Sequence, residues 1–304
     1  MNGPGDLTYV YAVAPDTREV RASLKGLRGV SGAPVSLLGE PEPAPGPEPD
    51  PGPTSDPAPS SPPAPVAFVV SRVAPDEFDE RTLKARFEDL EWLEGVARAH
   101  HEVVQTVARH DTVLPLRLAT VYQNDDRACR ALAAQRRVFA ERIALLRDRS
   151  EFGVKLYLSP TGPPDPREGT AADGSLTPGK AYLRSRRAQH SAQEVRYRHA
   201  QEAADRVEAL ASRFSTHRVR HPAQRGALAG PEENVLNDAY LVPYDRAEEF
   251  RTALTAVVEG LDGVRVEVTG PWAPYSFATP SPPPAPEATG ETRETGGTGE
   301  GRAP

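Results

Sequence analysis

The chain contains 304 residues, enough for two ordinary domains, and its formal net charge is −7. Residues 40–65 account for −5 of this charge and residues 280–304 for −2, so the remainder is neutral and has no overall basic field that would attract nucleic acid. Cys129 is the single cysteine, which excludes an intrachain disulfide framework and multi-cysteine metal sites, and no apolar run approaches the roughly 20 residues of a membrane-spanning helix.

The N-terminal part of the chain predicts two strands separated by a long insertion. The segment Leu7–Val13 is rich in β-branched and aromatic residues, and Val66–Val70 has the same character. Three glycines between residues 25 and 35 indicate turns rather than a dinucleotide-binding loop, because no strand leads into them and no helix follows. Residues 41–65 alternate proline with small and acidic residues, so we expect a disordered insertion within the first domain.

From Asp79 the apolar residues recur at spacings of three and four, which predicts two consecutive helices or one helix broken near Asp89–Trp92. The apolar positions of this stripe are Leu83, Phe87, Leu90, Leu93, Val96, His100, Val103 and Val107. A strand is predicted at Leu116–Tyr122, and a helix from Asp125 to Arg149. In that strand Arg117 stands between large apolar residues. Because side chains alternate between the two faces of a strand, Arg117 either faces solvent or an interface, or is buried and paired with an opposite charge. The first interpretation is at least as good as the second.

The second half of the chain predicts the element order strand, long helix, strand, strand, helix, strand. The corresponding segments are Phe152–Leu158, Lys180–Arg213, Phe214–Val219, Asn234–Val242, Asp245–Glu259 and Val264–Val268. This is the split order of ferredoxin-like domains, in which two helices cover one face of four antiparallel strands. We therefore predict an α+β protein with a mixed α+β domain in residues 1–150 and a ferredoxin-like (βαββαβ) domain with long helices in residues 151–277. A disordered acidic tail is expected in residues 278–304.

The segment Thr269–Phe277 places three aromatic residues among two prolines, directly after the last predicted strand. Gly270 and the following proline are expected to end the strand, and the prolines stiffen the segment. We interpret Trp272, Tyr275 and Phe277 as a structural clamp that folds back over the helices or sheet of the second domain. Direct docking of a partner is the alternative.

No residue pattern in the chain indicates an enzyme or a metal site. His100 and His101 are adjacent, whereas helical zinc ligands stand four residues apart on one face, so His100 is interpreted as a hydrogen-bonded core residue. Cys129 lies in a predicted helix without an activating neighbour. The sequence has no Gly-x-Ser-x-Gly elbow and no phosphate-binding loop, so we expect no catalytic residue, no cofactor and no small-molecule substrate.

The predicted helix after Pro178 carries a local excess of positive charge. Its cationic residues are Lys180, Arg184, Arg186, Arg187, Arg196 and Arg198, against Glu194 alone. A solvated helix surface is the preferred explanation, because no aromatic RNA-binding strand accompanies the helix. The alternative is a ferredoxin-like regulatory or nucleic-acid-binding module that uses helix 180–198.

Six groups of residues together resemble the gas vesicle protein GvpL/GvpF family. They are Trp92–Glu94 with His100–His101, Val113–Arg117 with Thr120–Tyr122, Phe152–Leu158, Pro178–Arg184, Asp238–Val242 and Thr269–Phe277. They span nearly the whole ordered chain in the family's order, and the last is highly specific. The family usually has Phe-Gly-Thr after the arginine, so this chain departs from the family pattern at Ala119.

The resemblance implies an accessory protein of gas vesicle formation rather than an enzyme. It implies binding to the small hydrophobic shell protein GvpA and to other accessory Gvp proteins, during assembly or as a minor vesicle component. The implied location is the cytoplasm and the gas vesicle, with no membrane or nucleic acid involved. We expect the N-terminal domain to capture shell subunits through partly apolar surface. The partner-binding residues that we predict are Trp92, Val96, His100, Val103, Arg117 and Tyr122.

Overall fold

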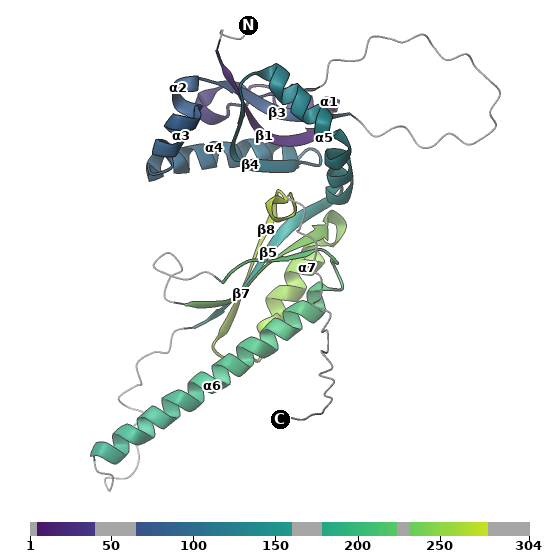
Figure 1. Cartoon of the computed structure of the whole chain (residues 1–304). Helices are drawn as coiled ribbons and strands as arrows, with labels where there is room; N and C mark the ends of the chain where they lie inside the picture. Colours follow the sequence, from purple (N-terminus) through teal and green to yellow (C-terminus); the bar gives the residue numbers. More distant parts are fainter. Residues whose placement is uncertain (1–4, 40–64, 160–177, 224–231, 279–304) are drawn as a thin grey trace, which may run out of the picture.

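The computed structural model describes residues 5–39, 65–159, 178–223 and 232–278. The predicted disorder of the insertion at 41–65 and of the tail at 278–304 therefore falls outside the described residues, apart from residues 65 and 278. The described chain is an α+β protein with two four-stranded antiparallel sheets, one above the other in Figure 1.

The first sheet is built from strands far apart in the sequence. Its strands are β1 (Leu7–Pro15), β2 (Ser36–Leu38), β3 (Val66–Val73) and β4 (Leu114–Tyr122). They lie in the order β2-β3-β1-β4. Helices cover both faces of this sheet, which explains why β1 and β3 are apolar almost without interruption.

Among its described residues, the first half of the chain contains five α-helices. They are α1 (Arg18–Ser23), α2 (Pro75–Phe78), α3 (Glu80–Arg86), α4 (Leu90–Ala108) and α5 (Asp125–Leu146). The predicted break near residue 89 is confirmed, because Asp89 caps α4 by accepting the Trp92 N–H at 3.1 Å. Helix α4 covers the side of the first sheet that faces the second sheet, and α5 covers the opposite side (Figure 1).

Strand β4 is interrupted by a wide bulge. Thr120 pairs with Val10 of β1, but the next pair is Pro115 with Ala12, so residues 116–119 have no direct partner on β1. Ala119 lies in this bulge with φ of +59°, a conformation in which glycine is favoured. The sequence predicted a regular strand here, and this prediction is wrong for the bulged residues 116–119.

The second sheet contains β5 (Arg149–Leu158), β6 (Arg218–Arg220), β7 (Glu233–Pro243) and β8 (Val264–Trp272), in the order β6-β7-β5-β8. Helices α6 (Pro178–Ala211) and α7 (Ala247–Thr255) cover one face of this sheet. The strand order is the same as in the first sheet when the strands of each half are counted from its own start. Strand β8 continues to Trp272, so the expectation that Gly270 ends it is wrong.

Helix α6 extends well beyond the sheet that it covers. Its apolar contacts with the core involve Ala203, Val207 and Ala211, near its C-terminal end. The preceding turns contain exposed residues, including Tyr182 and Leu183, and Figure 1 shows this part of the helix projecting away from both sheets.

Side chains of both halves meet in the apolar cluster around α5. On α5, Leu132, Phe139 and Ile143 pack against the first sheet, and Leu241 of the second sheet belongs to the same cluster. Phe277, in the short 3-10 helix η5 (Tyr275–Phe277), completes it. The shared cluster joins the halves through side-chain packing as well as through the chain itself.

Candidate partner-binding surface

Most of the predicted helical stripe faces inward. Val96, His100 and Val103 are buried against the first sheet, while Trp92 is half-buried near the start of α4. A partner cannot touch the three buried side chains while this packing persists. Their contribution to a binding surface would be to hold α4 in place.

His100 is a hydrogen-bonded core residue, as its sequence context predicted. The Tyr9 hydroxyl lies 3.0 Å from His100 Nδ1 and accepts the backbone N–H of Ala119 at 3.1 Å. The hydroxyl can use its own proton for only one bond, and it donates this proton to Nδ1 when the neutral imidazole is protonated on Nε2. Burial lowers the pKa of His100 to about 4, which favours that neutral form.

Apolar side chains are exposed where α3 passes into α4. We call Phe87, Leu90, Trp92 and Leu93 the α3–α4 patch. Leu90 is 77% exposed and Phe87 46% exposed, and the Phe87 and Trp92 rings lie 6.4 Å apart. The patch stands on two capped helices, so it is presented on a fixed backbone.

Arg117 and Tyr122 lie on the side of the sheet that carries α5. Arg117 is exposed on the β4 bulge, whereas the Tyr122 ring is half-buried and stacks on Phe68 with ring centroids 6.0 Å apart. The six predicted residues therefore do not form one surface. They divide between the core, the α3–α4 patch and the α5 side.

The aromatic segment after β8 lies between the two halves. Its contacts include those of His101 with the Trp272 and Tyr275 rings, at centroid distances of 6.0 and 5.9 Å. The Ala273 N–H donates to Gln105 Oε1 of α4 at 2.7 Å. We predicted that this segment folds back over the second domain. The prediction was incomplete, because the segment packs on the first half as well as on the second sheet.

The segment is tied to the second sheet through the half-buried carboxylate of Glu151. Both oxygens of Glu151 accept hydrogen bonds from Ser276, from the backbone N–H at 2.8 Å and from the hydroxyl at 2.6 Å. Burial raises the pKa of Glu151, and the two hydrogen bonds partly oppose this by favouring the charged form. Sequence reasoning missed Glu151 and Gln105, because only the tertiary fold brings them to this segment.

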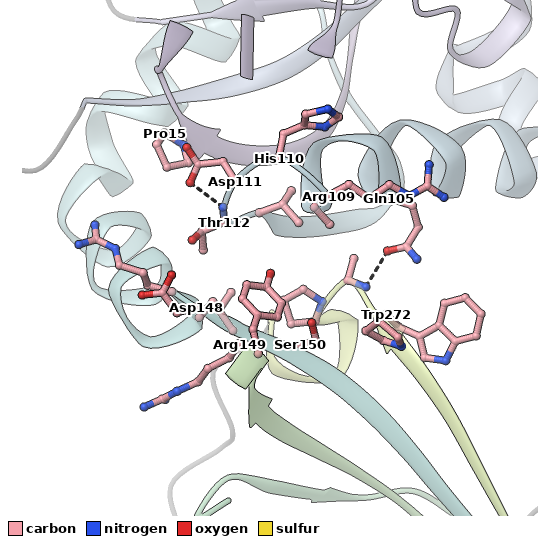
Figure 2. Close-up of a pocket in the computed structure, with 18 of the residues that line it drawn as sticks. Pro15, Gln105, Arg109, His110, Asp111, Thr112, Asp148, Arg149, Ser150 and Trp272 are labelled. Carbon is pink, nitrogen blue, oxygen red and sulfur yellow. Dashed lines mark hydrogen bonds between the residues drawn. The ribbon is translucent and has the colours of Figure 1, made fainter. Parts of the chain in front are cut away.

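A half-open cavity of about 860 Å³ lies at the junction of the two halves (Figure 2). The end of α4 and the following loop form one wall, including Arg109 and Asp111, and Arg149 and Trp272 come from the second sheet. Asp111 is held in place by the Thr17 hydroxyl at 3.1 Å and the Thr112 N–H at 2.7 Å. These contacts give the cavity a mixed polar lining with charges of both signs.

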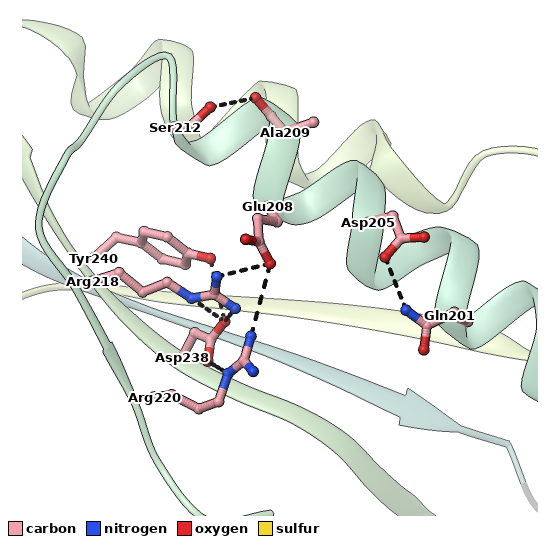
Figure 3. A network of polar contacts seen from close by, with 9 residues as sticks. All are labelled: Gln201, Asp205, Glu208, Ala209, Ser212, Arg218, Arg220, Asp238 and Tyr240. Carbon is pink, nitrogen blue, oxygen red and sulfur yellow. Dashed lines mark hydrogen bonds and ion pairs between the residues drawn. The ribbon is translucent and has the colours of Figure 1, made fainter. Parts of the chain in front are cut away.

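A charged network fixes β6 and β7 beneath α6 (Figure 3). Asp238 is buried and accepts from Arg218 at 2.6 Å, and Arg218 also pairs with Glu208 of α6 at 2.9 Å. The Tyr240 hydroxyl donates to Asp238 at 3.3 Å. The rule applied to Arg117, that a charged residue within an apolar strand must be exposed or paired, would have identified Asp238 from the sequence.

Two kinds of feature are absent from the described residues. No group of three or more His, Cys, Asp or Glu side chains there is arranged to hold a metal ion. None of the described helices has both the length and the apolar character needed to cross a bilayer.

The chain is similar to gas vesicle proteins over almost its full length. The sequence model described as "Gas vesicle synthesis protein GvpL/GvpF" matches residues 7–279. Gas vesicle protein L of Streptomyces sp. (strain CB03234) is 35% identical over 292 residues, covering 95% of this chain and 98% of the relative. Gas vesicle protein F2 of Halobacterium salinarum is 25% identical, with 62% of this chain and 70% of the relative covered.

Solved structures support the same relationship at the level of the fold. The crystal structure of GvpF from Anabaena sp. PCC7120 has a TM-score of 0.53 and 17% identity, and the match covers 91% of this chain and 97% of that one. For GvpF from Microcystis aeruginosa the TM-score is 0.51 and the identity 17%, with 90% and 99% covered. With the family match over residues 7–279 and the 35% identical relative, these findings show that the chain belongs to the GvpL/GvpF family of gas vesicle synthesis proteins.

Proposed function

We propose that this accessory protein binds the hydrophobic shell protein GvpA, together with other accessory Gvp proteins, during gas vesicle assembly. Membership of the GvpL/GvpF family carries the proposal. The protein would act in the cytoplasm and at the gas vesicle, without a cofactor or a catalysed reaction. A subunit with an apolar surface needs an apolar counterpart of fixed shape until it joins the shell.

The α3–α4 patch is the contact surface that we propose for the shell subunit. Leu90 and Phe87 are more exposed than large apolar side chains usually are, and Trp92 adds an aromatic ring beside them. The buried stripe of Val96, His100 and Val103 would hold this patch in position from below. Arg117 and Tyr122 would contribute to a separate contact on the α5 side.

The proposal is tested by capture of tagged GvpA with variants of the full chain. Leu90→Asp should reduce the captured GvpA at least tenfold, because it places a charge in an apolar contact while the exposed position tolerates it in the fold. Leu183→Asp is the matched control, since Leu183 is 57% exposed on the projecting part of α6. Loss of capture with Leu183→Asp but not with Leu90→Asp would place the contact in the second half and refute the proposed surface.

We further propose that Trp272, Tyr275 and Phe277 act as a structural clamp, one that joins the two halves. The ring contacts with His101 and the place of Phe277 in the shared cluster support this role. We retain residues 1–150 and 151–277 as the two domains and propose a ferredoxin-like fold for the second. Its strand order and the two helices on one face support that assignment.

A nucleic-acid-binding role for α6 is the second candidate function. The favourable observation is that Arg184, Arg186 and Arg187 are all exposed on the projecting part of the helix. This candidate requires tight binding of RNA or DNA that weakens with salt and is lost when these three residues are replaced by alanine. We rank it below shell-protein binding, since the described chain as a whole matches a gas vesicle family.

A further inference from the structure

A second, smaller groove lies beside the β4 bulge. Its volume is about 370 Å³, and it is formed by β4, α5 and the segment after β8. The side chains lining it include Pro115, Leu116, Val138, Phe139 and Tyr275. Tyr275 and Val138 remain partly exposed, at 36% and 42%, so apolar surface in the groove is open to a ligand.

Two arginines flank this apolar surface. Arg117 and Arg142 line the groove, and neither side chain has an ion-pair partner among the residues that the structure describes. Nearby on the same side of the fold, Arg137 pairs with Glu141 and Arg72 with Asp125. The groove thus offers apolar contact next to two available guanidinium groups, which suits a segment that combines apolar and acidic residues.

The chain itself supplies such a segment at the groove. Ala278 lines the groove and is the last residue that the structure describes. The sequence continues with Pro280-Ser-Pro-Pro-Pro-Ala-Pro286, followed by Glu287 and Glu291. Proline-rich segments favour the extended polyproline II conformation and dock on grooves with aromatic walls, losing little conformational entropy.

We propose that residues 280–291 occupy this groove in the free protein, with the prolines against Tyr275, Phe139 and Val138 and the acidic residues at Arg117 and Arg142. The tether is short, because the segment starts two residues after a residue that lines the groove, so its effective concentration there is high. The occupied groove would cover Arg117 and so compete with any acidic segment of another protein. This proposal does not depend on shell-protein binding.

The experiment is a titration with a fluorescent peptide of residues 279–293, followed by anisotropy. The shortened chain that ends at Ala278 retains every described residue, and circular dichroism would verify that its melting temperature matches that of the full chain. We expect the shortened chain to bind the peptide. The full chain should bind it at least tenfold more weakly, because its own segment already occupies the groove.

Variants locate the binding and test it in the full chain. In the shortened chain, the double variant Arg117→Ala with Arg142→Ala should weaken peptide binding at least tenfold. Val138→Glu should have the same effect, because it places a negative charge in the groove that repels the acidic residues of the peptide. Arg130→Ala is the control on the exposed side of α5. In the full chain, Glu287→Gln with Glu291→Gln should strengthen binding of the added peptide, because the competing segment is weakened.

Three results would overturn the proposal. The first is equal affinity of the full and shortened chains for the peptide, or no binding by the shortened chain. The second is equal weakening by Arg130→Ala, which would indicate diffuse attraction between charges. The third is self-association of the shortened chain that the peptide does not reverse, since a second copy would then be the occupant. None of these measurements uses GvpA, so they leave the proposed shell-protein contact unaffected.

Discussion

Replacement of His100 by glutamine should remove a large part of the loss in unfolding free energy that the first half suffers at acidic pH. His100 is 3% exposed, and burial lowers its pKa from 6.5 to about 4. A depressed pKa means that the folded state binds the proton less readily than the unfolded state. The stabilising contribution is therefore complete above pH 6.5 and is lost as the pH falls towards 4.

The size of the effect follows from that shift. Between pH 7.5 and pH 4.5 the depressed pKa of His100 should lower the free energy of unfolding by roughly 2 to 3 kcal/mol. The hydrogen bonds of His100 also indicate that its protonation destabilises the folded state. A protonated imidazole would donate from Nδ1 to the Tyr9 hydroxyl, which already accepts from Ala119 and would then lack an acceptor for its own proton.

The assay is urea unfolding at pH 7.5 and pH 4.5, monitored by tryptophan fluorescence. The chain has 2 tryptophans, so Trp272→Phe as a common background leaves Trp92, packed 5.7 Å from Phe78, to report on the first half. Over this interval His100→Gln should lose about 2 to 3 kcal/mol less of its free energy of unfolding than its parent does, with His101→Gln as the neighbouring control variant. Equal losses for His100→Gln and its parent, within about 0.5 kcal/mol, would refute the reasoning.

Four other substitutions test three separate parts of the fold by thermal unfolding. Asp238→Asn should cost about 2 to 4 kcal/mol, because it removes the buried carboxylate that pairs with Arg218. Glu208→Gln, at an exposed position, should cost much less, and similar losses for the two variants would contradict this account of the network. Ala119→Gly should be neutral or stabilising by up to about 1 kcal/mol, since φ is +59°, and a clear loss of stability would contradict the claim of backbone strain. Gly270→Ala should cost about 2 kcal/mol or more, because φ is +122° and the added Cβ would lie 2.7 Å from a backbone carbonyl oxygen; an unchanged melting temperature would show that the segment can move.

Local sequence patterns were sufficient for most elements of the fold. The period of three and four predicted α3 and α4, and the β-branched runs predicted β1, β3 and β5. The β4 bulge was beyond this reasoning, because it depends on how β4 pairs with β1 and not on the local composition. The same limit explains why β8 continues beyond Gly270, because pairing with β5 resumes at Trp272, opposite Glu151, after an irregularity in the register.

The candidate surface was predicted less well than the fold. Periodicity identified the apolar face of α4, but an apolar face is most often the one that packs on the core, as Val96 and Val103 do. The residues of that stripe left exposed, Leu90 and Phe87, lie at the junction of α3 and α4. Contacts between the halves, such as that of Gln105 with Ala273, join residues far apart in the sequence and leave no local pattern.

The apolar cluster around α5 has a practical consequence for dissecting the molecule into fragments. A cut near residue 150 would leave α5 with the first fragment and uncover Leu241 on the second, while Phe277 would lose its place beside Phe139. Each fragment would then carry a newly exposed apolar face that is absent from the intact protein. Such faces would retain a hydrophobic shell subunit without specificity, and they would also draw the two fragments back together when mixed. Binding sites in this protein are therefore better mapped by single substitutions in the uncut chain.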